Sequence, residues 1–394
     1  MGDGSGAPEV PGSEIGRRGL LRGALGGTAA AGIGLTVGTA GQAQAAGQDT
    51  ATGTDGATGT DGATGADGAA GADGAAGATE AGAARERARR RGDGHPVSLR
   101  WLGVAGWELA FEGHHILVDP YLSRQEYRVP GTGAIDADRP LEPMPDLVEH
   151  VVNGHLPAPP DLVLVTHGHF DHLLDVPHLL DRPAWQEHPI RTLCGETSWH
   201  LLRGMGTSRA RTDGCVVLTG GEVLRFPAGP TATTPAYTVE AFRSLHSQYG
   251  GHGFFAPGTL NDPPAQVRTL GDMREGGTLA YQVTVGADRL RVMFLSGTAN
   301  FVEREVSGAR PDVLVLGVSG QTAVHRYVER VMEALGAPPV VVPSHHDDML
   351  TSLRGPEPDL AASVNKAAVE SLRTTVAAYG ARVLEPRHLR TLEL

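Results

Sequence analysis

Short runs of apolar residues, bounded by glycine, proline and charged residues, recur along the chain from residue 98 onward. Runs of this length and with these boundaries are typical of strands. The first three, at 98–102, 107–111 and 116–118, are separated by glycine-containing turns and predict a strand meander. The later runs predict further strands at 162–165, 190–193, 216–218, 237–242, 279–285, 290–295, 313–316 and 340–342.

Longer segments carry a helical pattern. Helices are predicted at 173–180, 198–204, 323–335 and 361–379. Strand-rich runs punctuated by helices in both halves predict an α/β (α+β) fold, in which two sheets pack together with helices outside. Two irregular stretches, 123–160 and 250–276, are expected to shape the pocket; the first is long enough to be a functional lid or else disordered.

The composition changes sharply near Pro96. Before it the chain consists mostly of Gly, Ala, Thr and Asp, and a glycine falls at every third position from Gly53 to Gly77. That is the collagen period, but the run lacks the proline that would pre-organise a triple helix. We expect residues 46–95 to be a flexible, solvated and disordered spacer, with a weak trimerising stalk as the alternative, and residues 96–394 to form the folded domain.

The first 45 residues resemble a twin-arginine export signal. Arg17-Arg18 precedes a weakly apolar run at 23–37, and Ala43-Gln44-Ala45 offers a small-x-small cleavage site. The resemblance implies export to the extracellular space or cell envelope of an already folded protein, which suits an enzyme that acquires its metal beforehand. After cleavage we expect no stable membrane span; without cleavage the same run could serve as an N-terminal anchor.

Charge and cysteine content exclude some classes of protein. The formal net charge is −12, and the single short basic cluster, at 85–91, is interpreted as a solvated segment. An acidic chain without a basic stripe is not expected to bind nucleic acid. Cys194 and Cys215 form no CxxC pair, so a structural zinc knuckle is not expected, and both a disulfide and two free thiols remain open.

The chemistry is concentrated where the predicted strand at 162–165 stops. It is followed at once by His167-Gly168-His169-Phe170-Asp171-His172. His167 and His169 lie two apart on a turn, so both imidazoles can converge on one ion, while Asp171 and His172 can face a second ion or a metal-bound water. Imidazole and carboxylate together suit zinc, with manganese or iron as alternatives. An accidental histidine-rich surface tract would lack the apolar strand before it and the apolar helix after it.

Residues 166–172 resemble the HxHxDH signature of the metallo-β-lactamase superfamily, and residues 101–107 and 116–120 resemble the opening of its lactonase-like and phospholipase-D-like branches. The resemblance implies a four-layer αββα sandwich and a metal-dependent hydrolase. It also implies a third histidine for the first metal, for which His246 is chosen over His252. A last histidine after a late strand is assigned to His345, with His346 as the alternative.

One departure from that family concerns the aspartate that bridges two metals in a Gly-Asp-Thr turn. The matching turn here is 296–300, and Thr298 is predicted to stand where the aspartate belongs. Because a neutral hydroxyl is a poorer bridging ligand, the site is expected to hold either one tightly bound ion or a weak second one helped by Asn300. Asp119, at an earlier strand end, is a candidate to support a ligand histidine, or is simply a turn residue before Pro120.

These residues predict an exported hydrolase that uses a metal-activated water on a small ester, lactone or phosphodiester. The family pattern assigns His167, His169 and His246 to the first ion. It gives Asp171 the role of orienting the water, and it gives His172 and His345 a second ion or the developing oxyanion. The alternative is a metal-binding surface protein with degenerate or no catalysis. The oligomeric state and the number and identity of the metal ions remain open.

Overall fold

The structure is a computed structural model that describes residues 96–156, 158–228, 232–249, 252–286 and 290–394. The predicted signal at 1–45 and the predicted spacer at 46–95 lie outside these residues. The described part contains two seven-stranded mixed sheets. Among its helices, none combines the length and the apolar character that a membrane crossing requires.

The first sheet contains the strands of the predicted meander. In chain order its strands are β1 (Val97–Gly103), β2 (Gly106–Phe111), β3 (His114–Val118), β4 (Leu162–Leu164), β5 (Arg191–Cys194), β6 (Cys215–Val217) and β14 (Thr391–Glu393). The spatial order is β14-β1-β2-β3-β4-β5-β6. Strands β14 to β3 pair antiparallel and β3 to β6 pair parallel. Cys194 and Cys215 lie on neighbouring strands of this sheet and are free thiols.

The second sheet has the same mixed character. Its strands are β7 (Val223–Pro227), β8 (Pro235–Arg243), β9 (Leu279–Val285), β10 (Leu290–Leu295), β11 (Val313–Gly317), β12 (Val340–Ser344) and β13 (Arg382–Val383). The spatial order runs from β13 through β12, β11, β10, β9 and β8 to β7. Strands β7 to β10 pair antiparallel and β10 to β13 pair parallel.

The helices are mostly short. They are α2 (Pro145–His155), α3 (Phe170–Leu173), α4 (Val176–Leu180), α5 (Glu196–Gly204), α6 (Arg209–Thr212), α7 (Glu303–Val306), α8 (Tyr327–Ala334), α9 (Glu357–Ala362) and α10 (Lys366–Ala377). In the described part of the chain, 3₁₀ turns lie at Pro183–Trp185, Leu270–Asp272 and Gln321–Ala323.

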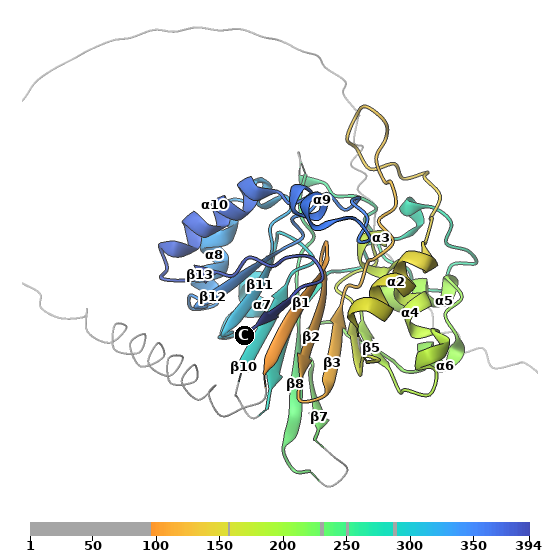
Figure 1. Cartoon of the computed structure of the whole chain (residues 1–394), viewed down its shortest axis with the longest axis horizontal. Helices are drawn as coiled ribbons and strands as arrows, with labels where there is room; N and C mark the ends of the chain where they lie inside the picture. The colour runs from red at the N-terminus through yellow and green to blue at the C-terminus, as the bar shows by residue number, and fades with distance from the viewer. Residues whose placement is uncertain (1–95, 157, 229–231, 250–251, 287–289) are drawn as a thin grey trace, which may run out of the picture. The chain divides into compact units, whose positions relative to one another are not determined.

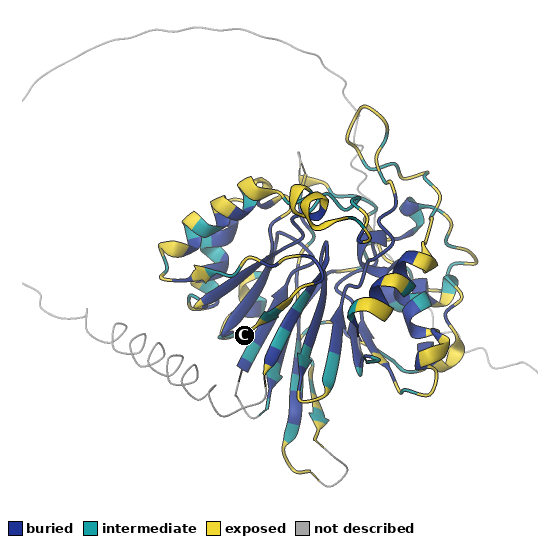
Figure 2. Ribbon diagram, viewed as in Figure 1, coloured by how far each residue is buried: buried dark blue, intermediate teal, exposed yellow. Residues whose placement is uncertain are grey.

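Three apolar clusters define the layers. The central cluster joins the inner faces of the two sheets and includes Trp107 and Tyr281, both fully buried. A second cluster packs α2, α4 and α5 on the outer face of the first sheet, and a third packs α8 and α10 on the outer face of the second. The helices accordingly show a buried inner face and an exposed outer face (Figures 1 and 2). The predicted αββα sandwich is confirmed.

Some helix predictions need correction. The irregular stretch at 123–160 contains α2, whose apolar stripe of Leu147, Val148, Val151 and Val152 faces the core behind an N-terminal proline. The helix expected at 361–379 is two helices, because Asn365 interrupts it and caps α10 by accepting a hydrogen bond from the Ala368 amide. Strands β7, β13 and β14 are short or half-exposed and were not predicted.

Strand direction brings several loops to one rim of the sandwich. Because β8 and β10 are both antiparallel to β9, they run the same way as β11 and β12. The carboxyl ends of β8, β10 and β12 therefore point to the same edge. The segments that follow these strands and β4 carry His246, Gly297, His345 and the histidine-rich turn.

Candidate metal centre

The turn after β4 packs closely against a neighbouring segment, and this contact requires a glycine at position 168. The Gly168 amide donates to the Glu275 carbonyl, 3.0 Å away, and a Cβ at position 168 would overlap the backbone carbonyl of Arg274. Helix α3 then begins at Phe170, with His169 as its N-cap residue in extended conformation. The glycine thus lets the turn lie against the 274–275 backbone, with His167 and His169 in the turn and Asp171 and His172 in the first turn of the helix.

His167, His169 and His246 form the first of two triplets of potential metal ligands, and their nitrogens lie within 4.8 Å of one another. Nε2 of His167 is 3.1 Å from Nδ1 of His169. Nδ1 of His246 is 2.8 Å from the Ser247 carbonyl oxygen, so a proton on Nδ1 donates to it and leaves Nε2 free. Each ring thus presents a nitrogen to its neighbours, and three imidazole nitrogens this close can share one ion.

The charge state of this triplet suits metal binding. Burial lowers the pKa of His167 well below its usual range, and lowers the pKa of His169 to about 3 and that of His246 to about 4. The neighbouring imidazoles reinforce the effect, because two protonated rings this close would repel. All three rings are therefore neutral at physiological pH, which is the form that coordinates a metal.

Asp171, His172 and His345 form the second triplet, also within 4.8 Å. Oδ2 of Asp171 is 3.3 Å from Nε2 of His172 and 3.1 Å from Nε2 of His345. Burial opposes ionisation of Asp171, but His172 and His345 outweigh it and hold the pKa of the carboxyl well below its usual range. Burial likewise opposes protonation of His172, but the carboxylates of Asp171 and Asp119 raise its pKa to about 10.

Asp119 supports the second triplet from behind, as expected for a strand-end aspartate. It is fully buried, and its Oδ2 lies 2.9 Å from Nδ1 of His172. It also accepts hydrogen bonds from the amide and hydroxyl of Thr166, and that hydroxyl lies 3.0 Å from Nδ1 of His167. One carboxylate therefore fixes the ring orientation of His172 directly and that of His167 through Thr166, with both Nε2 atoms facing the cluster.

The structure distinguishes the chosen histidines from their alternatives. His252 is exposed and contacts Gln248 outside both triplets. His346 is buried against Trp101, with ring centroids 4.2 Å apart and planes 8° apart, and neither of its ring nitrogens has a partner. The structure thus brings together all six predicted ligands, namely His167, His169, Asp171, His172, His246 and His345. Five imidazoles and one carboxylate are a donor set that fits zinc or a similar divalent ion.

The prediction for the bridging position needs correction. The Thr298 hydroxyl donates to the Leu245 carbonyl, 2.8 Å away, and the Asn300 amide donates to the His246 carbonyl at 3.1 Å. Both side chains therefore hold the loop that carries His246 rather than facing the triplets. Gly297 lines the cavity instead, and a Cβ there would overlap the Thr166 hydroxyl and lie 3.1 Å from Oδ2 of Asp119. No side chain from this turn bridges the two triplets.

A buried clamp behind His345 was not predicted from the sequence. His345 has a positive φ of 52°, and its amide donates to the Val104 carbonyl at 2.8 Å. The Val104 amide donates to Oδ2 of Asp347 at 3.1 Å, and Asp347 also pairs with Arg124 at 2.8 Å. Gly103 is required beside this pair, because a Cβ there would overlap the Arg124 guanidinium. The sequence gives only an arginine that follows a predicted strand, and this pattern is too common to indicate a buried ion pair with Asp347.

The two triplets open into one cavity of about 650 Å³. Tyr127 and Ile135 contribute from the first irregular stretch, and Phe254 and Phe255 contribute from the second. Both stretches thus shape the pocket, as expected. His169, Asp171, His246 and His345 lie in its wall, so a molecule in the cavity can contact both triplets.

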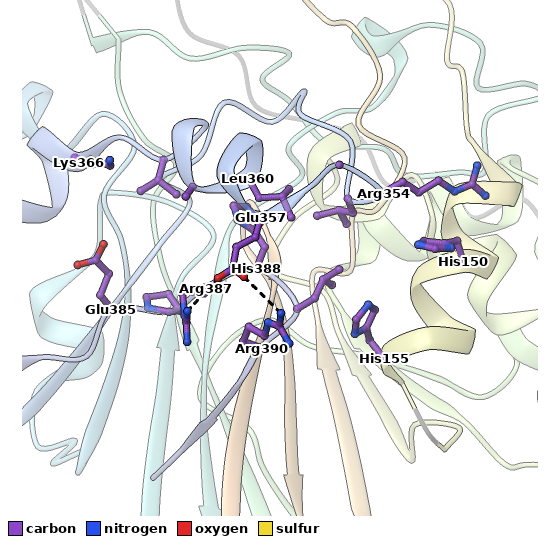
Figure 3. A pocket seen from close by; sticks show the side chains of 16 residues that line it. His150, His155, Arg354, Glu357, Leu360, Lys366, Glu385, Arg387, His388 and Arg390 are labelled. Carbon is purple, nitrogen blue, oxygen red and sulfur yellow. Dashed lines mark hydrogen bonds and ion pairs between the residues drawn. The ribbon is translucent and has the colours of Figure 1, made fainter.

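A separate cavity of about 410 Å³ lies between α2, α9 and the segment before β14 (Figure 3). Glu357 pairs there with Arg387 at 3.0 Å and with Arg390 at 3.5 Å. His388 lines this cavity and also contacts Asp347 of the clamp, with Nε2 2.8 Å from Oδ2. Among the described residues, neither ligand triplet borders this cavity.

Comparison with known proteins identifies the family. Residues 98–345 match the family described as the beta-lactamase superfamily domain, which covers well over half of the chain. The chain therefore belongs to the β-lactamase superfamily, and with its histidine and aspartate triplets this confirms the resemblance to the metallo-β-lactamases.

The individual proteins that resemble this chain match it over a short segment or at low sequence identity. A curated relative, a UPF0173 metal-dependent hydrolase of Methanopyrus kandleri, is 34% identical over 86 residues, or 22% of this chain. The match spans only 27% of that relative's length. A metallo hydrolase of Ignicoccus hospitalis is 18% identical with a TM-score of 0.42, and covers 76% of this chain and 99% of its own. The metallo-β-lactamase fold protein YhfI of Bacillus subtilis is 13% identical with a TM-score of 0.45. Its match covers 76% of this chain and 100% of the YhfI chain.

Proposed function

We propose that this protein is an exported metal-dependent hydrolase, acting on a small ester, lactone or phosphodiester, with zinc as its metal. The observation that carries the proposal is the meeting of two ligand triplets in one cavity. Five neutral or neutralisable imidazoles favour zinc over magnesium or calcium, which prefer oxygen ligands. Membership of the superfamily supports hydrolysis as the reaction.

A divalent ion held by these residues would supply a nucleophilic water at neutral pH and polarise the bond under attack. Asp171 lies beside His172 and His345 in the second triplet, so its carboxylate can orient a water and accept its proton. The same carboxyl group can then return the proton to the leaving oxygen. Asp119 and Thr166 keep the rings of His167 and His172 from turning away during this cycle.

A second candidate function is metal binding without turnover. The observation that favours it is Gly297, which leaves no carboxylate between the triplets. The two functions differ in what the loaded protein does to a substrate, and they agree on its metal content.

The test is turnover by the zinc-loaded protein on chromogenic esters, lactones and phosphodiesters, compared with Asp171→Asn. We expect the variant to lose about 10²-fold or more in kcat, because general acid–base catalysis contributes on that order. It should keep zinc at the first triplet, since Asp171 is not one of its ligands. Turnover that survives in the variant would contradict the role of Asp171, and zinc binding without turnover in the wild type would favour the second candidate.

Export is a separate part of the proposal, supported by the twin-arginine resemblance at 1–45. Replacing Arg17 and Arg18 with lysines should leave the protein inside the producing cell. Unchanged export of that variant would contradict a twin-arginine route.

A further inference from the structure

The wall of the active cavity beyond the ligands is aromatic and aliphatic. Its apolar members include Tyr127, Ile135, Phe254, Phe255 and Met349, all partly exposed, and Tyr249, which is 49% exposed. Exposed apolar side chains gathered in a concave site are typical of a surface that a ligand covers.

This apolar surface begins directly beside the ligand triplets. The Phe254 ring stacks on His246, with centroids 4.8 Å apart and planes 26° apart. The Phe255 ring lies 5.5 Å from that of His169. A substrate whose reacting bond lies at the triplets must therefore place its adjoining groups against these aromatic rings.

The same wall offers no positive side chain to an anionic group. Among the described lining residues none is lysine or arginine, and the polar groups besides the ligands are hydroxyls, such as those of Ser247 and Ser319. Residues 250 and 251, which precede this segment in the chain, are both glycine. Arg128 lies over the Tyr127 ring at 5.6 Å but is exposed and paired with Glu126 at 3.2 Å.

The phenol that borders the site is also neutral. Tyr249 is neutral at physiological pH because the ordinary pKa of a tyrosine is about 10. A carboxylate carried on a group that lies against this wall would lose its hydration without gaining a cation. Burying an unpaired charge in this way is costly, whereas burying an apolar group is favourable.

We propose, on the basis of the function proposed above, that the substrate is an uncharged carboxylic ester or lactone whose acyl side group is apolar. Hydrolysis adds water across the acyl C–O bond: the hydroxyl oxygen joins the acyl carbon, the C–O bond breaks, and the departing alkoxide takes the proton. The reaction needs no oxidant, reductant or other co-reactant.

The test compares three substrates of the zinc-loaded full-length protein that share a 4-nitrophenyl leaving group. They are 4-nitrophenyl pentanoate, the mono-4-nitrophenyl ester of glutaric acid, which adds a carboxylate at the end of a chain of the same length, and bis(4-nitrophenyl) phosphate. We expect kcat/KM for the pentanoate to exceed that for the glutarate ester by about 100-fold or more, because the wall cannot pair its carboxylate. Bis(4-nitrophenyl) phosphate carries its charge at the reacting centre, and a kcat/KM for it above that for the pentanoate would overturn the choice of a carboxylic ester. An equal or reversed preference would overturn the inference while leaving the hydrolase function intact.

Absence of turnover on all three, with zinc bound, would instead overturn the proposed function.

A matched pair of variants tests the wall itself. Ile135→Lys introduces a cation and should raise kcat/KM for the glutarate ester about tenfold while lowering it for the pentanoate. Ile135→Gln, similar in length but neutral, should lower the pentanoate rate without helping the glutarate ester. If lysine and glutamine act alike, charge at this wall does not set the preference.

Discussion

At the scale of single residues, the histidines of the first triplet differ in charge from His172 of the second when no ion is bound. Those of the first triplet are neutral, since burial keeps the pKa values of His169 and His246 at about 3 and about 4. His172 of the second triplet is protonated, with a pKa of about 10, because Asp171 and Asp119 stabilise the imidazolium. An ion entering the second triplet must displace that proton.

This difference predicts the proton balance of metal binding. Apart from protons lost by metal-bound water, the ligands of the first zinc ion should release almost no protons near neutral pH, and those of the second should release about one. Affinity for the second ion should therefore rise with pH up to about 10, whereas affinity for the first should be flat above about pH 5. Calorimetric titration in buffers of different ionisation enthalpy measures the protons released, and equal release at both steps would contradict the assignment.

The turn at 296–300 makes a second residue-scale prediction. Thr298 is 3% exposed and its hydroxyl donates to a carbonyl, so Thr298→Asp would bury a carboxylate against an acceptor. We expect a loss of stability of about 1–3 kcal/mol and no gain of metal. Thr298→Ser keeps the hydroxyl and is the control. Thermal unfolding and elemental analysis check both points, and extra zinc in the aspartate variant would show that residue 298 does face the triplets.

At the scale of elements, the clamp ties the turn between β1 and β2 to the end of β12. Arg124 is 4% exposed and neutralises Asp347, whose side chain is fully buried. Arg124→Ala would leave that carboxylate short of its cation and should cost about 3–5 kcal/mol. It should also lower the affinity of the second triplet for its metal ion, since the clamped segment carries His345.

Arg128→Ala is the matched control. Its side chain is exposed, so the expected change is within about 0.5 kcal/mol. Urea unfolding and zinc titration of the two variants should separate them clearly. Similar behaviour would mean that the clamp neither stabilises the domain nor positions His345.

The sequence predicted elements where local pattern decided the structure. Buried strand β11 is a continuous apolar run, and β9 is an apolar run interrupted only by Gln282 and Thr284. Both were found, and the ligands that follow strand ends were found with them. Helix α2 was missed because its apolar stripe is hidden in a proline-rich stretch. Gly297 was missed because assigning the bridging position requires knowing which way the turn faces, and that depends on packing between Thr166 and Asp119.

At the scale of the whole domain, the metal centre joins the two sheets. His167 and His169 follow β4 of the first sheet, whereas His246 and His345 follow β8 and β12 of the second. An ion shared across the rim should therefore stabilise the native state as a whole. At a zinc concentration about 100 times its Kd we expect Tm to rise by roughly 4 °C per bound ion over chelator-treated protein. An unchanged Tm would mean that zinc does not bind the native state selectively.

The most direct measurement of the central claim is the number of zinc ions per chain, determined by elemental analysis after equilibration with excess zinc at mildly alkaline pH. The account predicts about two ions in the wild type, and about one in each of His167→Ala and His345→Ala, because each variant disrupts one triplet. No bound zinc in the wild type, or the same content in all three proteins, would contradict a metal centre built from these residues.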